Sequence, residues 1–259
     1  MSKTTKLTVE KSGHLLLIGL NRPDKMNAAD LEMLQALSLA YGELDRDPEL
    51  RVGLVFAHGD HFTAGLDLED VGPRLATGSL NLVPEGGLDP WGVSTRQVSK
   101  PVVMAIQGNC FTLGVELALN SEIVVAADNV RLAQLEVARG IMPFGGATLR
   151  FPDVAGHQRA MRYLLTGDHF FALEAKEMGL VNEVVPVGSE FERAKQLALL
   201  IAEQAPLAVQ QTLASARNRH NPEEKQEIFK RLQGLMKTKD VTRGMQAFMT
   251  RTKAVFKGD

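Results

Sequence analysis

Short apolar runs alternate with helical stretches through the first two-thirds of the chain, and this alternation limits the possible folds more than any other feature. The runs that we interpret as strands are 14–20, 52–59, 101–108, 122–127 and 130–134. Between the first two, residues 30–44 repeat leucine at helical spacing, and Asp47-Pro48 ends the pattern. Strands separated by helices indicate an α/β fold with parallel strands rather than a β-sandwich.

Residues 71–92 interrupt this rhythm. Their proline and glycine content predicts a long surface loop, and loops of that length commonly cover a ligand site. We therefore expect a flap beside a ligand site rather than a neutral insertion.

The strand signal stops after Pro186, and four amphipathic helices follow. Their starts are marked by Ser189, Pro206, Asn221-Pro222 and Asp240. We therefore divide the chain into a β/α core, 1–188, and a helical region, 189–259, which would pack on the core or on neighbouring subunits.

Composition excludes several classes of partner. The net charge is −2 with no basic block, so there is no electrostatic case for nucleic acid. The apolar stretches are too short to span a bilayer, and the N-terminus lacks the apolar segment of a secretory signal. The single cysteine, Cys110, allows no internal disulfide and fits a reducing compartment. We expect a cytoplasmic protein that binds neither membrane nor nucleic acid.

Two glycine-bearing turns can leave backbone N–H groups free. In "HFTAGLDL", Ala64 and Gly65 permit a turn that frees the N–H of Leu66, and Asp67 can cap the turn that follows. In "GNCFTLGVELAL", a helix that begins near Leu113 has free N–H groups at its positive end. Such groups can stabilise an oxygen that gains negative charge.

Two glutamates, Glu116 and Glu136, stand near these turns. Glu116 lies one turn inside the second helix, where it could also serve only to complement the helix dipole. Glu136 is surrounded by apolar residues in "LAQLEVA", which predicts burial, a raised pKa and general-acid behaviour. Two carboxyls beside two free N–H groups can stabilise an enolate while moving protons near it.

Other chemistries lack the residues that they need. The chain has no nucleophile elbow, no phosphate-binding loop and no dinucleotide fingerprint. His58 and His61 have no third metal ligand nearby in the sequence, and Cys110 has no adjacent base, so we interpret them as loop and core residues. We expect neither a metal nor a redox cofactor.

In order, "LNRPDKMNA", "HFTAGLDL", "AIQGNCFTLGVELAL" and "AQLEVARGIMPFGGATLR" resemble motifs of the enoyl-CoA hydratase/isomerase (crotonase) superfamily. "ALEAKEMGLVNEVVP" is similar to the segment that closes its core. The resemblance covers nearly the whole chain. It implies a crotonase-like spiral of ββα units, a helical C-terminal region used for oligomerisation in a homotrimer or dimer of trimers, and a coenzyme A thioester as ligand, with no separate cofactor.

The resemblance also assigns roles to residues. The N–H groups of Leu66 and Leu113 would bind the thioester oxygen, and hydratases of the family keep both glutamates, whereas isomerases typically keep only the second. This favours hydration of a trans-2-enoyl-CoA, with Glu116 activating water and Glu136 exchanging a proton at Cα. The residues expected to contact substrate are Lys25, Met26, Ala28, Ala64, Gly65, Asp67, Leu68 and Gly114.

One departure from the family pattern bears on substrate choice. Thr112-Leu113-Gly114 replaces a run of glycines, and Leu66 replaces a smaller residue, so the acyl pocket would be reshaped. Trp91 could cover the acyl group. Isomerisation, acyl-CoA hydrolysis, dehydration of a specialised 3-hydroxyacyl-CoA and non-catalytic acyl-CoA binding remain alternatives.

Overall fold

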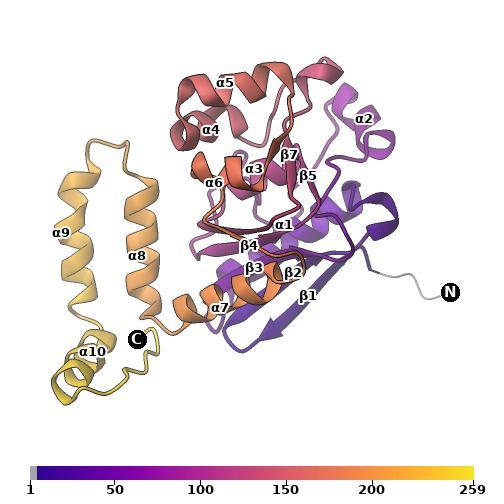
Figure 1. Ribbon diagram of the computed structural model, residues 1–259. Helices are drawn as coiled ribbons and strands as arrows, with labels where there is room; N and C mark the ends of the chain where they lie inside the picture. Colours follow the sequence, from indigo (N-terminus) through magenta and orange to yellow (C-terminus); the bar gives the residue numbers. More distant parts are fainter. Residues whose placement is uncertain (1–4) are drawn as a thin grey trace.

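The computed structural model describes residues 5–259 and contains two sheets (Figure 1). The larger sheet has the order β1-β2-β3-β4-β6-β9, with strands at Leu7–Ser12, Leu15–Leu20, Val52–Ala57, Val102–Ile106, Ile123–Ala127 and Glu183–Val185. The smaller sheet has the order β5-β7-β8, with strands at Asn109–Phe111, Arg131–Ala133 and Phe170–Phe171. All five strands expected from the apolar runs form, and the mixed α/β class is confirmed.

The larger sheet is parallel apart from its first pair. β1 and β2 form an antiparallel hairpin, and β2, β3, β4, β6 and β9 then pair in parallel. Every residue of β2 and β4 is buried, which explains their unbroken apolar sequence: parallel strands covered on both faces need no polar side.

Helices cover both faces of this sheet (Figure 1). α1 (Leu31–Arg46) packs on β1, β2 and β3, and its N-cap Asp30 accepts a hydrogen bond from the N–H of Met33. On the opposite face, α7 (Glu190–Ala202) packs on β2, β3, β4 and β6 through Ala194, Ala198 and Ala202, which are all buried. Small residues on α7 let this helix approach the strands closely.

The prediction of an unbroken loop over 71–92 is wrong in its first part. The chain forms α2 (Leu68–Thr77) there, although this helix contains Pro73, and the loop runs over residues 78–101, beyond the expected end at 92. Glu69 and Asp70 in the first turn and Gly78 as a left-handed C-cap favour the helix, and these signals outweigh the proline.

The remaining short helices of the core lie in the connections between strands. These are η1 (Pro23–Lys25), α3 (Leu113–Leu119), η2 (Val137–Arg139), α4 (Ala147–Ala155), α5 (His157–Thr166) and α6 (Ala172–Glu177). One residue separates β5 from α3, and three residues separate β7 from η2. Because β5 and β7 are paired, the segments that carry Glu116 and Glu136 follow neighbouring strands of one sheet.

The last three helices extend away from the core (Figure 1). α8 (Pro206–Arg217) and α9 (Glu224–Leu235) lie side by side, and α10 (Lys239–Thr250) lies beyond them. Phe229, Phe248 and Met249 are 72%, 86% and 75% exposed, and exposed apolar side chains on this scale are typical of a protein contact surface. The division after residue 188 stays a prediction, and α7 itself packs on the sheet.

Within residues 5–259, the structure contains no helix that combines the length and the apolar character required to cross a bilayer.

Candidate active site

The first glycine turn is clamped between two parts of the chain. On one side the N–H of Ala64 donates to the carbonyl of Met26 at 2.9 Å. On the other, the N–H of Phe111 donates to the carbonyl of Thr63 at 3.0 Å, so Thr63 forms an isolated parallel β-bridge with Cys110 of β5. This double anchoring fixes the direction of the turn.

Gly65 shapes the turn because no other residue fits. Its φ is +102°, and a Cβ at this position would lie 2.3 Å from Oγ1 of Thr112. The next amide, the N–H of Leu66, donates to no acceptor within the described residues 5–259. The turn therefore leaves one N–H group available to a ligand, as the sequence predicts.

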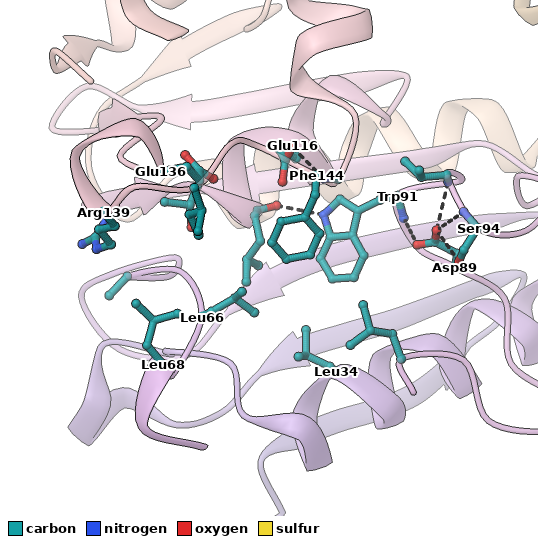
Figure 2. Close-up of a pocket in the computed structure, with 17 residues that line it drawn as sticks. Leu34, Leu66, Leu68, Asp89, Trp91, Ser94, Glu116, Glu136, Arg139 and Phe144 are labelled. Carbon is teal, nitrogen blue, oxygen red and sulfur yellow. Dashed lines mark hydrogen bonds between the residues drawn. The ribbon is translucent and has the colours of Figure 1, made fainter. Parts of the chain in front are cut away.

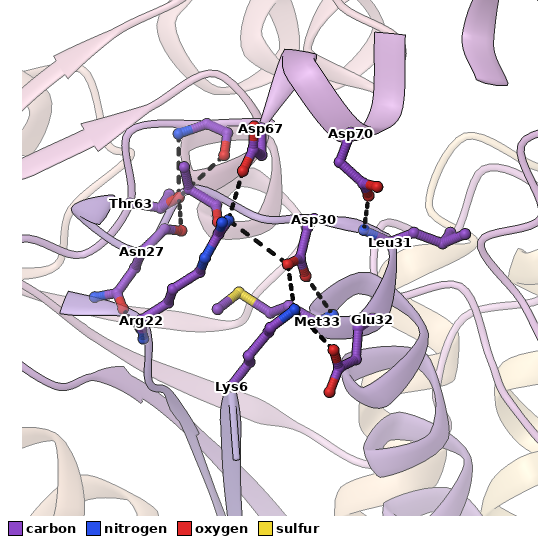
Figure 3. Close-up of polar contacts among 12 residues, drawn as sticks. Lys6, Arg22, Asn27, Asp30, Leu31, Glu32, Met33, Thr63, Asp67 and Asp70 are labelled. Carbon is purple, nitrogen blue, oxygen red and sulfur yellow. Dashed lines mark hydrogen bonds and ion pairs between the residues drawn. The ribbon is translucent and has the colours of Figure 1, made fainter. Parts of the chain in front are cut away.

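A polar network holds the outer side of this turn (Figure 3). Nη1 of Arg22 donates to Oδ2 of Asp67 at 2.7 Å and to the carbonyl of Ala28 at 2.9 Å, and the arginine lowers the pKa of Asp67. The expected capping of the following turn by the Asp67 carboxylate is not seen: Asp67 occupies the N-cap of α2, but its side chain bonds to Arg22 and makes no capping hydrogen bond there.

The second turn leads into α3. The N–H of Thr112 donates to the carbonyl of Ala133 at 2.8 Å, and the φ of Thr112 is +48°, a strained value for a residue with a Cβ. The N–H of Leu113, the first residue of α3, has no acceptor in the part of the chain that the structure describes. Gly65 and Thr112 lie against each other, and each is followed by a residue, Leu66 or Leu113, whose N–H is free in the described chain.

Trp91, from the loop after α2, packs against this second turn. Its indole Nε1 donates to the carbonyl of Leu113 at 3.0 Å, and its backbone N–H donates to Oδ1 of Asp89 at 2.9 Å. Trp91 is only 5% exposed. The expected flap is therefore, at this point, a fixed wall of the site.

Glu116 is held by the turn that precedes α4. Its Oε1 accepts hydrogen bonds from the N–H of Gly145 at 2.8 Å and of Ala147 at 3.1 Å. Glu116 is 3% exposed, and burial raises its pKa to about 7, with the charge of Glu136 acting in the same direction. Because Oε1 takes both bonds, Oε2 remains available to a ligand.

Glu136 lies at the start of η2 and is 5% exposed, which confirms the predicted burial. With its amide oriented to donate, Nε2 of Gln134 lies 2.9 and 3.0 Å from the two oxygens of Glu136. Burial raises the pKa of Glu136. Sequence analysis did not single out Gln134, although it stands two positions before Glu136 in the same motif.

A single pocket brings most of these groups together (Figure 2). Both carboxyls lie on the side opposite Leu34, Leu66 and Leu68. Six of the residues expected to act in catalysis or contact substrate line it: Ala64, Leu66, Leu68, Leu113, Glu116 and Glu136. Trp91, which could cover the acyl group, lines it too. The others that line it are Leu34, Leu82, Asp89, Val93, Ser94, Thr112, Arg139, Ile141, Phe144 and Gly145.

The remaining expected contacts lie outside this lining. These are Lys25, Met26, Ala28, Gly65, Asp67 and Gly114. Lys25 and Met26 are exposed at the end of η1. Gly114 serves packing, because a Cβ there would lie 2.6 Å from Cγ2 of Thr63, and its absence lets α3 approach the first turn.

The two histidines and the cysteine have ordinary structural partners. Nε2 of His58 lies 2.9 Å from Oγ1 of Thr8, and Nδ1 of His61 accepts from the N–H of Asn109. Cys110 is buried in β5. No group of three or more potential metal ligands gathers among residues 5–259.

Glu116→Gln is expected to stabilise the fold above neutral pH. The folded pKa of about 7 exceeds the ordinary 4.5, so the stability that the protonated carboxyl contributes is complete below about pH 4.5 and is lost as pH rises to about 7. That loss is on the order of 2 to 3 kcal/mol at most, and a glutamine does not suffer it. Thermal unfolding should favour the variant more at about pH 8 than at about pH 5. An equal difference at both would contradict the assignment.

Comparison with known proteins adds to this geometry. A model of the family described as Enoyl-CoA hydratase/isomerase matches residues 10–259. An enoyl-CoA hydratase of Mycobacterium tuberculosis is 33% identical over 81% of this chain and 79% of its own length. A carnitinyl-CoA dehydratase of Salmonella typhi is 32% identical over the whole of both chains. The crystal structure of a probable enoyl-CoA hydratase/isomerase from Mycobacterium abscessus is 46% identical, with a TM-score of 0.94 over 98% of this chain and 99% of that one.

Proposed function

Because the chain belongs to the enoyl-CoA hydratase/isomerase family, we propose that it adds water across the 2,3 double bond of a trans-2-enoyl-CoA. The membership confirms the crotonase-like fold predicted from the motifs and makes an acyl-CoA thioester the ligand class. The observation that carries the finer proposal is one apolar pocket lined by Leu66 and Leu113, whose N–H groups are free, and by two buried glutamates.

In this proposal the thioester oxygen lies between the N–H groups of Leu66 and Leu113. As water bonds to Cβ, electrons of the double bond move toward the carbonyl and give an enolate. Two fixed N–H donors in a site that excludes water stabilise that charge without reorganising, and the loss of one such donor typically reduces kcat by about 100- to 1,000-fold.

The two glutamates divide the proton transfers. Glu116 accepts a proton from the attacking water through Oε2, since its other oxygen is held by two backbone donors. Glu136 gives a proton to Cα as the enolate collapses, and proton exchange with solvent then returns both carboxyls to their starting states. Burial raises the pKa of both carboxyls, and an acid or base is most effective when its pKa lies near the working pH, which supports a part for each of them in proton transfer. Neither step needs a cofactor beyond the coenzyme A of the substrate.

The experiment that tests the proposal is the hydration of crotonyl-CoA and longer trans-2-enoyl-CoAs, followed by loss of the conjugated double bond and by mass spectrometry of the product. We expect a product heavier by one water. Binding of these thioesters without turnover would support the alternative of a non-catalytic acyl-CoA-binding protein, although both leucines line the pocket and leave it open. An isomerised or hydrolysed product would identify another reaction of the same enolate.

Dehydration of a specialised 3-hydroxyacyl-CoA is the second candidate. The likeness to a carnitinyl-CoA dehydratase and the guanidinium of Arg139 in the pocket wall favour it. Incubation with a panel of 3-hydroxyacyl-CoAs separates the two, because a dehydratase of this kind would convert one functionalised substrate far faster than an unbranched chain.

We also propose that the chain forms a homotrimer or a dimer of trimers through the exposed apolar residues of α8–α10. Light scattering should then give a mass of three or six chains of 28.3 kDa, and the mass of one chain would contradict it. The cytoplasmic location stays a prediction.

A further inference from the structure

Arg150 makes two hydrogen bonds that have no part in the proposed proton transfers. It lies in the first turn of α4 and is half-buried. Both of its side-chain hydrogen bonds go to carbonyl oxygens rather than to a carboxylate: Nη1 donates to Gly145 at 3.2 Å, and Nη2 donates to Trp91 at 2.8 Å. The planar guanidinium thus bridges two segments that are more than fifty positions apart in the chain.

Each bridged segment controls one part of the pocket. The turn at Gly145–Gly146 supplies the N–H groups of Gly145 and Ala147 that hold Glu116. The loop at Trp91 supplies the indole that bonds to the carbonyl of Leu113. The side chain of Arg150 therefore links the turn that holds the Glu116 carboxyl to the loop that bonds to the start of α3, where the N–H of Leu113 is free.

The glycines of the turn are shaped around this arginine. Gly146 has a φ of +101°, and a Cβ there would lie 2.1 Å from Nη1 of Arg150. A Cβ on Gly145 would lie 2.5 Å from Oε2 of Glu116 and 2.9 Å from Cδ1 of Trp91. The turn is therefore packed between the guanidinium on one side and the glutamate on the other.

We propose that Arg150 is a positioning residue for the proposed reaction: it fixes the Gly145–Gly146 turn and the Trp91 loop so that Glu116 and Leu113 keep their orientation toward the substrate. This inference rests on the proposed function. A lysine could reach only one of the two carbonyls, so the fork geometry of arginine is essential to the role.

The charged groups around Glu116 and Arg150 determine how the pKa of Glu116 should respond when Arg150 is replaced. Glu116 faces Glu136 and Arg150, whose positive charge acts to lower the pKa of Glu116. Arg150 in turn faces Asp89 and Arg217. Removal of the guanidinium takes away that charge and loosens the two N–H donors, and both effects raise the pKa of Glu116.

The test compares Arg150→Met and Arg150→Lys with wild type, and uses Arg162→Met, an exposed arginine of α5, as the matched control. The pKa of Glu116 is measured by NMR titration of ¹³C-glutamate-labelled protein without substrate, and Arg150→Met should raise it by about one unit. Its kcat for hydration should fall about 10- to 100-fold, and the acidic limb of the pH profile should move upward. Arg150→Lys should keep the limb near its wild-type position yet lower kcat, and Arg162→Met should change neither.

A double-mutant cycle separates positioning from general support. In the Glu116→Gln background, Arg150→Met should lower kcat less than it does in wild type, because only the part that acts through Trp91 and Leu113 remains, whereas fully multiplicative losses would overturn the role. If Arg150→Met does not fold, Arg150→Lys still tests the proposal, because a wild-type kcat in that variant would overturn the positioning role of Arg150. If wild type hydrates nothing, the proposed function fails alone, because the carboxyl titration of the free protein still decides whether Arg150 acts on Glu116.

Discussion

Glu136→Gln is expected to lower kcat for enoyl-CoA hydration by about 100- to 10,000-fold while KM changes only a few-fold. Glutamine keeps the size of the side chain and its place beside Gln134, but it cannot give a proton to Cα. Glu116→Gln should have an effect of the same order, because an amide cannot take a proton from water. Steady-state kinetics on crotonyl-CoA measures both.

The matched control is Glu177→Gln, on the exposed side of α6, which should leave kcat unchanged. Combining the two active-site changes should cost less than the product of the single losses, since the glutamates act on one water and one double bond. If either single variant retained full turnover, the role given to that carboxyl would be wrong.

Gly65→Ala is expected to lower stability by about 2 to 4 kcal/mol and kcat by at least about 100-fold. The φ of +102° is unfavourable for alanine, and the new Cβ would meet Oγ1 of Thr112 at 2.3 Å. Relief of that collision moves the N–H of Leu66 away from its position. Chemical denaturation and steady-state kinetics measure the two losses.

Gly78→Ala separates this steric effect from a general intolerance of alanine at positive φ. Gly78 has a φ of +66° at the end of α2, and no atom lies within 4 Å of the position that its Cβ would occupy. This control should lose about 1 kcal/mol and no activity. Equal losses of kcat in the two variants would show that the fit of Gly65 against Thr112 has no bearing on catalysis.

Four strands of the larger sheet were predictable because they are buried. β2, β3, β4 and β6 are parallel and covered on both faces, so each leaves an unbroken apolar run in the sequence. β5, β8 and β9 have only two or three residues each and leave no such run. α2 escaped notice because Pro73 is a strong local signal for a break, whereas the cap at Gly78 is a weaker one.

The candidate site likewise contains residues that the sequence predicts and residues that it does not. The two turns and the two glutamates carry local signals, namely glycines after a strand and a carboxyl among apolar residues. The groups that orient them do not: Gly145 and Arg150 meet Glu116 and Trp91 only after folding, across separations of 29 and 59 positions. Arg150 thus follows from the three-dimensional packing rather than from any pattern along the chain, whereas Gln134 stands in the same motif as Glu136 and was overlooked there.

The central claim concerns where a carbonyl oxygen binds, and the most direct measurement is a crystal structure of Glu136→Gln with crotonyl-CoA. We predict the thioester oxygen at about 3 Å from the backbone nitrogens of both Leu66 and Leu113, with Cβ facing Glu116. A thioester oxygen bonded elsewhere, or an acyl chain outside the pocket beside Trp91, would contradict the account.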